Sequence, residues 1–232
     1  VSIKKQAAAD ELVEGWRELG NEYSVTPERP DLSEAFWTTL ANVPLVEERY
    51  SGTASLLHKE MITGISMFND ITEEIIAHLV KYLTSHTYTP FSFSCDQNSD
   101  LQILFYEPSK HDRDLLQDPH DDGLFMSYLK STAPGLEMLL SDGNYHSVPI
   151  SENQVLIMPG EIMSVMSGYR IPPMVHRVVR KKHQNERFSF AYFTVPNFMK
   201  GEKILPWIIN EKNKEVDIVD LAIRNRNQFR VY

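Results

Sequence analysis

The sequence is poor in cysteine and has no long apolar run. Its one cysteine, Cys95, rules out an internal disulfide framework and a zinc site built from cysteines. No stretch approaches the ~20 apolar residues that a membrane helix needs, and the N-terminus lacks the apolar core of a signal peptide. These absences predict a cytoplasmic protein that does not span a membrane.

Positive charge is also scarce. The chain has 23 Lys and Arg against 32 Asp and Glu, which gives a net charge of −9 at pH 7. A nucleic-acid binder needs a basic face, and the short basic run at residues 180–187 has the pattern of a solvated turn. A hydrophobic content of 42% is ordinary for a folded domain. We expect a globular protein, monomer or homodimer, whose partner is a small molecule and not a nucleic acid.

The first ninety residues favour helices. Apolar residues recur at helical spacing in residues 7–19, 31–43 and 69–83. In the third segment Asp70 and Glu73 have the spacing of a capping box, which predicts that the helix begins there. Its predicted core-facing residues are Ile71, Ile75, Leu79 and Tyr82.

From residue 91 the pattern changes to short strands bounded by turns. The predicted strands lie at residues 101–106, 125–129, 136–148, 154–160, 176–180 and 187–195. Asp142-Gly143 predicts a hairpin with a two-residue type I′ turn. Closely spaced strands without intervening helices indicate an antiparallel barrel or a double-sheet jelly roll, and therefore an α+β chain.

This pattern divides the chain into three parts. We expect residues 1–90 to be a helical region packed on the barrel and residues 91–200 to be the β core. Residues 201–232 would then be a C-terminal tail or lid.

The stretch "DPHDDGLFMSYL", residues 118–129, places three ionisable residues beside a run of apolar ones. If the backbone is extended there, alternation sends His120 and Asp122 to one face and Asp121 to the other. Such a pair can bind a metal ion from two points. Alone it is weak evidence, because this tripeptide pattern also arises by chance.

Two later strands supply complementary groups. His176 lies in the apolar run "PPMVHRVV", where a histidine is either a core residue or a third metal ligand. In "ERFSFAYFTV", Arg187 and Ser189 share a face, and a buried arginine needs an anionic partner. Two imidazoles and one carboxylate that leave three coordination positions open are typical of non-heme Fe(II) oxygenases. A closed zinc site would need a fourth ligand, and none occurs at a suitable spacing.

These motifs resemble those of the Fe(II)/2-oxoglutarate-dependent dioxygenases, in particular the isopenicillin N synthase-like branch. The resemblance covers roughly residues 101–197 and rests on "HDD" at 120–122, "MVHRVV" and "RFSFAYFTVPN". It implies a double-stranded β-helix core that binds Fe(II) and uses 2-oxoglutarate and O₂. It also implies that a small molecule of secondary metabolism is hydroxylated, desaturated or cyclised while succinate and CO₂ are released. It implies that His120, Asp122 and His176 are the metal ligands and catalytic centre, and that Arg187, Ser189 and Tyr106 hold 2-oxoglutarate.

Two alternatives stay open. Relatives similar to isopenicillin N synthase or ACC oxidase take electrons from the substrate or from ascorbate and keep a similar Arg-x-Ser pair. A non-catalytic metal-binding jelly roll is the other alternative. Leu104 stands where many relatives have an Asn beside the co-substrate. For the substrate we single out Phe125, Tyr128 and Arg170, of which the aromatics could equally be core residues.

Overall fold

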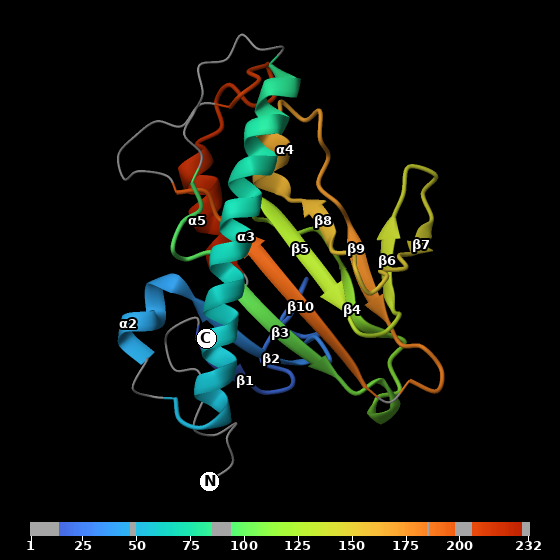
Figure 1. Ribbon diagram of the computed structural model, residues 1–232. Helices are drawn as coiled ribbons and strands as arrows, with labels where there is room; N and C mark the ends of the chain where they lie inside the picture. The colour runs from blue at the N-terminus through green and yellow to red at the C-terminus, as the bar shows by residue number, and fades with distance from the viewer. Residues whose placement is uncertain (1–13, 47–49, 85–93, 185, 198–205, 229–232) are drawn as a thin grey trace.

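Two antiparallel sheets face each other, and helices cover the outer face of the larger one (Figure 1). The computed structural model describes residues 14–46, 50–84, 94–184, 186–197 and 206–228. The six-stranded sheet runs in the order β1 (Gly15–Arg17), β2 (Glu34–Thr39), β3 (Asp100–Tyr106), β10 (Arg187–Thr194), β5 (Met126–Ser131) and β8 (Leu156–Pro159). The four-stranded sheet runs in the order β4 (Leu115–His120), β9 (His176–Val179), β6 (Leu136–Leu139) and β7 (Tyr145–Ser147).

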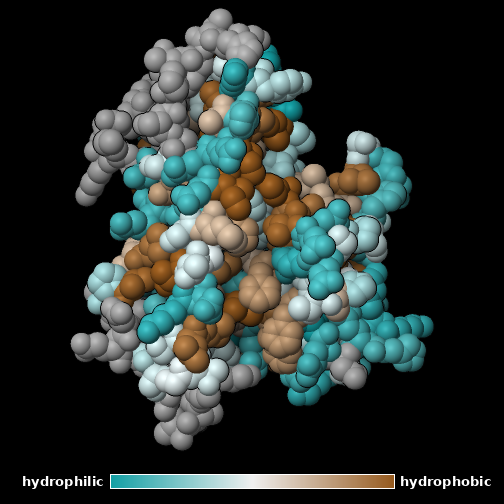
Figure 2. All heavy atoms as spheres, in the orientation of Figure 1, coloured by the Kyte–Doolittle hydropathy of each residue, from teal (hydrophilic) through white to brown (hydrophobic). Residues whose placement is uncertain are grey.

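Strand alternation decides what enters the space between the sheets. In β10, Arg187, Ser189 and Ala191 are buried, whereas Phe188 and Phe190 are 38% and 42% exposed on the outer face. Figure 2 shows apolar side chains gathered on this side of the molecule. The predicted separation of the β10 residues onto two faces is therefore confirmed, since successive side chains of a strand point in opposite directions.

The long helix α3 (Thr53–Leu83) lies across the outer face of the large sheet (Figure 1). Its buried side chains include Ile65 and Ile76, which join Tyr128 and Tyr192 of the sheet in the largest apolar cluster. The remaining helical elements are short: η1 (Leu40–Asn42), α2 (Val43–Val46), η2 (Pro108–Lys110), α4 (Glu161–Met166) and α5 (Ile218–Gln228).

Two of the three predicted helices are wrong. The segment 31–43 contains β2, and the described part of 7–19 contains β1, while residues 7–13 lie outside the described residues. Aromatic and β-branched residues such as Phe36, Trp37 and Thr38 favour strands, and β2 pairs with β3. That long-range pairing outweighed the local helical spacing, so the region before residue 91 is not purely helical.

The third helix exists, but its start and its buried face differ from the prediction. It begins at Thr53, so Asp70 and Glu73 lie in its interior and do not cap it. Ile71 and Tyr82 are 38% and 82% exposed, because the buried face is rotated by one residue and carries Thr72, Ile76 and Val80. Ile75 and Leu79 of the predicted face are partly buried and pack against the same apolar cluster as Ile76 and Val80. Helical periodicity alone could not decide between these two adjacent faces.

The Asp142-Gly143 hairpin forms with a different turn. Gly143 has φ +79°, and Asp142 is not among the non-glycine residues with positive φ. Gly143 N donates to Leu140 O (3.0 Å), and Leu140 N donates to Asn144 O (3.0 Å). This is a three-residue loop with a left-handed glycine, not a type I′ turn.

The predicted fold class is confirmed. The structure is an α+β chain whose core is a jelly roll of two facing antiparallel sheets. Within the described residues, no helix combines the length and the apolar character needed to cross a membrane.

Candidate metal centre and its cavity

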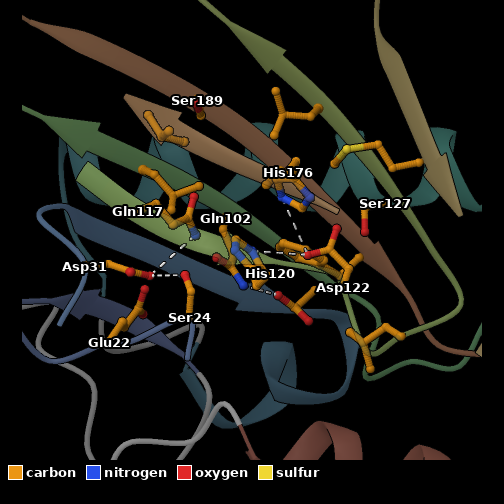
Figure 3. Close-up of a pocket in the computed structure, with 18 of the residues that line it drawn as sticks. Glu22, Ser24, Asp31, Gln102, Gln117, His120, Asp122, Ser127, His176 and Ser189 are labelled. Carbon is orange, nitrogen blue, oxygen red and sulfur yellow. Dashed lines mark hydrogen bonds and ion pairs between the residues drawn. The ribbon is translucent and has the colours of Figure 1, made fainter. Parts of the chain in front are cut away.

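The side chains of His120, Asp122 and His176 converge at one end of the small sheet. The register of β4 and β9 places His120 opposite His176. Oδ1 of Asp122 lies 3.7 Å from Nε2 of His120 and 3.9 Å from Nε2 of His176 (Figure 3). One ligand atom from each residue lies within 4.8 Å of the others. The three groups are close enough to bind a single metal ion.

Asp122 reaches this position from a loop, not from the predicted extended strand. β4 ends at His120, so strand alternation does not continue to Asp122. The loop is held by the start of α4: Glu161 N donates to Asp122 O (3.1 Å), and Gly160 N donates to Phe125 O (3.0 Å). A Cβ on Gly160 would overlap the Asp122 carbonyl oxygen, so this close approach requires glycine.

Both imidazoles are oriented by backbone carbonyls. Nδ1 of His120 lies 2.7 Å from Asp118 O, and Nδ1 of His176 lies 3.1 Å from Met174 O. A carbonyl oxygen only accepts hydrogen bonds, so each Nδ1 carries the proton. Each Nε2 then turns its lone pair toward Asp122, which is the tautomer that metal-binding histidines use.

The electrostatics of the cluster fit a divalent cation. Burial lowers the pKa of His176, with His120 adding to the effect and Asp122 opposing it, so the ring stays neutral. Oδ2 of Asp122 is buried without a hydrogen-bond partner among the described residues. Neutral imidazole nitrogens beside an unsatisfied carboxylate are a donor set suited to a metal ion such as Fe(II). In the described part of the chain, this metal-ligand cluster has only the three members.

A buried arginine lies between the sheets at the start of β10. Arg187 is 1% exposed, and its Nη1 donates to Ser189 Oγ at 2.5 Å. Its Nε and Nη2 are buried and have no hydrogen-bond partner among the described residues. Burial lowers the pKa of Arg187, with Tyr106 opposing the shift. Two unsatisfied guanidinium donors in the interior call for an anionic ligand.

Tyr106 lies next to this arginine. β3 and β10 place Tyr106 opposite Arg187, and the guanidinium carbon is 5.0 Å from the centre of the phenol ring. The Tyr106 hydroxyl donates to Gln117 Oε1 at 3.4 Å. Burial raises the pKa of Tyr106, so its hydroxyl remains a donor.

One cavity connects most of these groups; Arg187 itself is not among the described residues that line it, but its neighbours Tyr106 and Ser189 are. It is lined by the metal-ligand cluster, by Tyr106 and Ser189, and by apolar side chains of both sheets (Figure 3). Leu104 also lines it, at the position next to Ser189 in the β3–β10 register. The sequence prediction therefore selected residues from four strands and a loop that the fold brings to one cavity.

The three predicted substrate residues fall in different places. Tyr128 lines the cavity, and its hydroxyl is hydrogen-bonded to Thr72 Oγ1 at 2.8 Å. Phe125 is fully buried and packs edge-on against Trp207, outside the cavity lining. Arg170 is exposed on the connection after α4 and does not line the cavity. A substrate contact stays a prediction for all three residues.

Sequence reasoning missed several residues that line the cavity. Asp100 and Gln102 stand on the same face of β3 as Tyr106, and this alternation could have revealed them. Glu22 and Asp31 also line the cavity; Glu22 lies between two segments that were predicted as helices, and Asp31 begins the second of them. No local pattern marks these two as cavity residues.

Comparisons with known proteins point to one superfamily. Residues 98–196 match the family model of the 2OG-Fe(II) oxygenase superfamily. Clavatol oxidase of Penicillium crustosum is 32% identical over 166 residues, which is 65% of this chain and 49% of that protein. A gibberellin 2-beta-dioxygenase of Phaseolus coccineus is 31% identical over 91 residues, 39% of this chain and 27% of that protein. The chain thus spans about half the length of clavatol oxidase, and less of the second relative.

Solved structures share the fold. A full-length Neurospora crassa protein in complex with alpha-KG and thymine superposes with a TM-score of 0.75 at 18% identity, covering 98% of this chain and 78% of that one. A rice dioxygenase for auxin oxidation gives a TM-score of 0.68 at 17% identity, covering 99% of this chain and 76% of that one. The family model and clavatol oxidase support the superfamily, and they do not single out the isopenicillin N synthase-like branch.

Proposed function

We propose that this protein is an Fe(II)- and 2-oxoglutarate-dependent dioxygenase, because residues 98–196 match the family model of the 2OG-Fe(II) oxygenase superfamily. It oxidises a small-molecule metabolite by hydroxylation, desaturation or ring closure and releases succinate and CO₂. The observation that carries this proposal is the His120–Asp122–His176 cluster, whose ligand atoms lie within 4.8 Å of one another. The proposed catalytic region corresponds to residues 91–200.

The proposed roles follow from the geometry of each group. His120, Asp122 and His176 would hold Fe(II) from one side, which leaves the opposite side for reactants. Bound Fe(II) would supply the activation of O₂, which protein side chains cannot provide. The backbone carbonyls that fix both Nδ1 protons keep the two Nε2 atoms aimed at the metal position.

Arg187 would bind the distal carboxylate of 2-oxoglutarate. Its unpaired Nε and Nη2 supply two donors, and Ser189, already bonded to Nη1, lies at the same end of the cavity. A planar guanidinium matches a carboxylate better than any other cation in proteins. Tyr106 adds a neutral hydroxyl beside it.

An anaerobic titration tests the proposal. Fe(II) and 2-oxoglutarate added to the protein should give the weak visible charge-transfer band of the metal chelate. His176→Ala should abolish the band. His146→Ala is the matched control, because His146 is exposed and paired with Asp142, and it should leave the band unchanged.

The same titration separates the alternatives. A band that appears equally with His176→Ala would refute the ligand assignment. An Fe(II) oxidase that does not use 2-oxoglutarate would bind Fe(II) without the band, and it would release no succinate during turnover. A non-catalytic protein would bind metal and consume no O₂ with any candidate substrate.

A further inference from the structure

The wall of the cavity beside His120 is acidic. Glu22, Asp31 and Asp100 line it in addition to Asp122 of the metal-ligand cluster. No lysine or arginine is among the described residues that line this cavity. Figure 3 shows Glu22 and Asp31 together on the side of His120 away from Asp122. We call Glu22, Asp31 and Asp100 the acidic wall.

Among these residues, the hydrogen bonding of Asp31 is the most clearly incomplete. It is 5% exposed, and its Oδ2 accepts hydrogen bonds from Ser24 Oγ (2.7 Å) and Gln117 Nε2 (3.4 Å). Its Oδ1 is buried and has no hydrogen-bond partner among the described residues. A buried, unsatisfied carboxylate oxygen is costly unless a donor meets it, and Asp31 belongs to the cavity lining.

Glu22 repeats the pattern. Within the described part of the chain its Oε1 has no hydrogen-bond partner, and the Nε of Arg17 is 3.6 Å away. Burial raises the pKa of Glu22 to about 8, partly opposed by Arg17 and increased by Asp31 and Asp100. Arg17 forms an ion pair with Glu22, and a ligand that brings N–H donors or positive charge would further stabilise the two neighbouring carboxyl groups.

Gln102 adds a neutral acceptor. Its Nε2 donates to Asp100 Oδ2 at 2.8 Å, and both residues are at least nine-tenths buried. A carboxylate accepts hydrogen bonds, so the amide nitrogen of Gln102 faces Asp100. Its carbonyl oxygen is then available to accept from a ligand in the cavity.

We propose that the substrate is a nitrogen compound that presents a protonated amine or an N–H group to Asp31 and Glu22, and that carboxylic acids are disfavoured. This inference rests on the proposed function. The anionic co-substrate is assigned to Arg187 and the metal-ligand cluster. The unsatisfied Oδ1 of Asp31 and Oε1 of Glu22 are acceptors that an N–H donor can satisfy and a second carboxylate cannot.

Three compounds that share one carbon skeleton and differ only in their polar group test the inference: phenethylamine, phenylacetamide and phenylacetate. Each is titrated calorimetrically into protein loaded anaerobically with Fe(II) and 2-oxoglutarate. We expect phenethylamine and phenylacetamide to bind at least about tenfold more tightly than phenylacetate, because phenylacetate has no N–H group to donate to the unsatisfied Oδ1 of Asp31. Asp31→Asn should reduce this preference to less than about threefold, because an amide at 31 can also donate. Asp114→Asn removes a carboxylate whose side chain is 92% exposed and should keep the wild-type preference.

Each outcome decides the inference. Equal affinity for the three probes, including no binding by any, would overturn it, as would tighter binding of phenylacetate. If Asp31→Asn does not fold, Glu22→Gln provides the same test. Absence of the charge-transfer band in the loaded protein would refute the proposed function, whereas a normal band without probe discrimination would refute the substrate class alone.

Discussion

Arg187 provides a test in which stability and co-substrate binding should change in opposite directions. Replacing it by Met keeps an unbranched chain of similar length and removes the buried guanidinium. In the wild type, the buried and unpaired Nε and Nη2 of Arg187 each lower the free energy of unfolding by about 1–3 kcal/mol. The variant loses the hydrogen bond to Ser189, worth about 1.5–3 kcal/mol for a charged donor. We therefore expect Arg187→Met to raise the free energy of unfolding by about 1–3 kcal/mol without 2-oxoglutarate.

Denaturant unfolding with Fe(II), with and without 2-oxoglutarate, measures both effects. A ligand at one hundred times its Kd stabilises the wild type by about 2.7 kcal/mol, and the variant should lose nearly all of this gain. Arg177→Met is the matched control, because Arg177 is part-exposed and pairs with Glu137 at 2.8 Å. It should cost about 1 kcal/mol or less and keep the gain from 2-oxoglutarate.

The reasoning about Arg187 would fail on either of two results. One is an Arg187→Met variant less stable than the wild type without 2-oxoglutarate. The other is a variant that 2-oxoglutarate still stabilises as much as the wild type.

Three further predictions address the metal ligands, the loop and the cavity. Fe(II) under anaerobic conditions should raise the Tm of the wild type but not of His176→Ala, and equal shifts would contradict metal binding by this residue. Gly160→Ala places a Cβ against the carbonyl oxygens of Asp122 and Leu124, so the free energy of unfolding measured with denaturant should fall by more than about 2 kcal/mol. An unchanged free energy of unfolding would mean that the loop can move aside. Burial raises the pKa of Glu22 from 4.5 to about 8. The native state keeps a proton that the unfolded chain loses in this range, so stability falls as the pH rises between these values. Glu22→Gln should flatten this decline in the free energy of unfolding, and an unchanged slope would assign it to other groups.

Local residue patterns located most strands of the core, although β4, which carries His120, was not among the predicted strands. Alternation in a strand places Arg187 and Ser189 on one face whatever the strand pairs with, so spacing alone identifies them. His120 and Asp122 were also identifiable, since two ionisable residues beside an apolar run need a partner or a ligand.

Which elements share a surface depended on long-range packing. Residues 34–39 have a helical spacing of apolar residues, yet they form a strand because β3 offers a free edge for hydrogen bonds. The position of Asp122 depends on contacts with the start of α4, about forty residues later in the sequence. Asp31 and Glu22 face the cavity only because β1 and β2 extend the large sheet and bring the segment between them over His120. Such contacts join residues distant in sequence, and no local pattern encodes them.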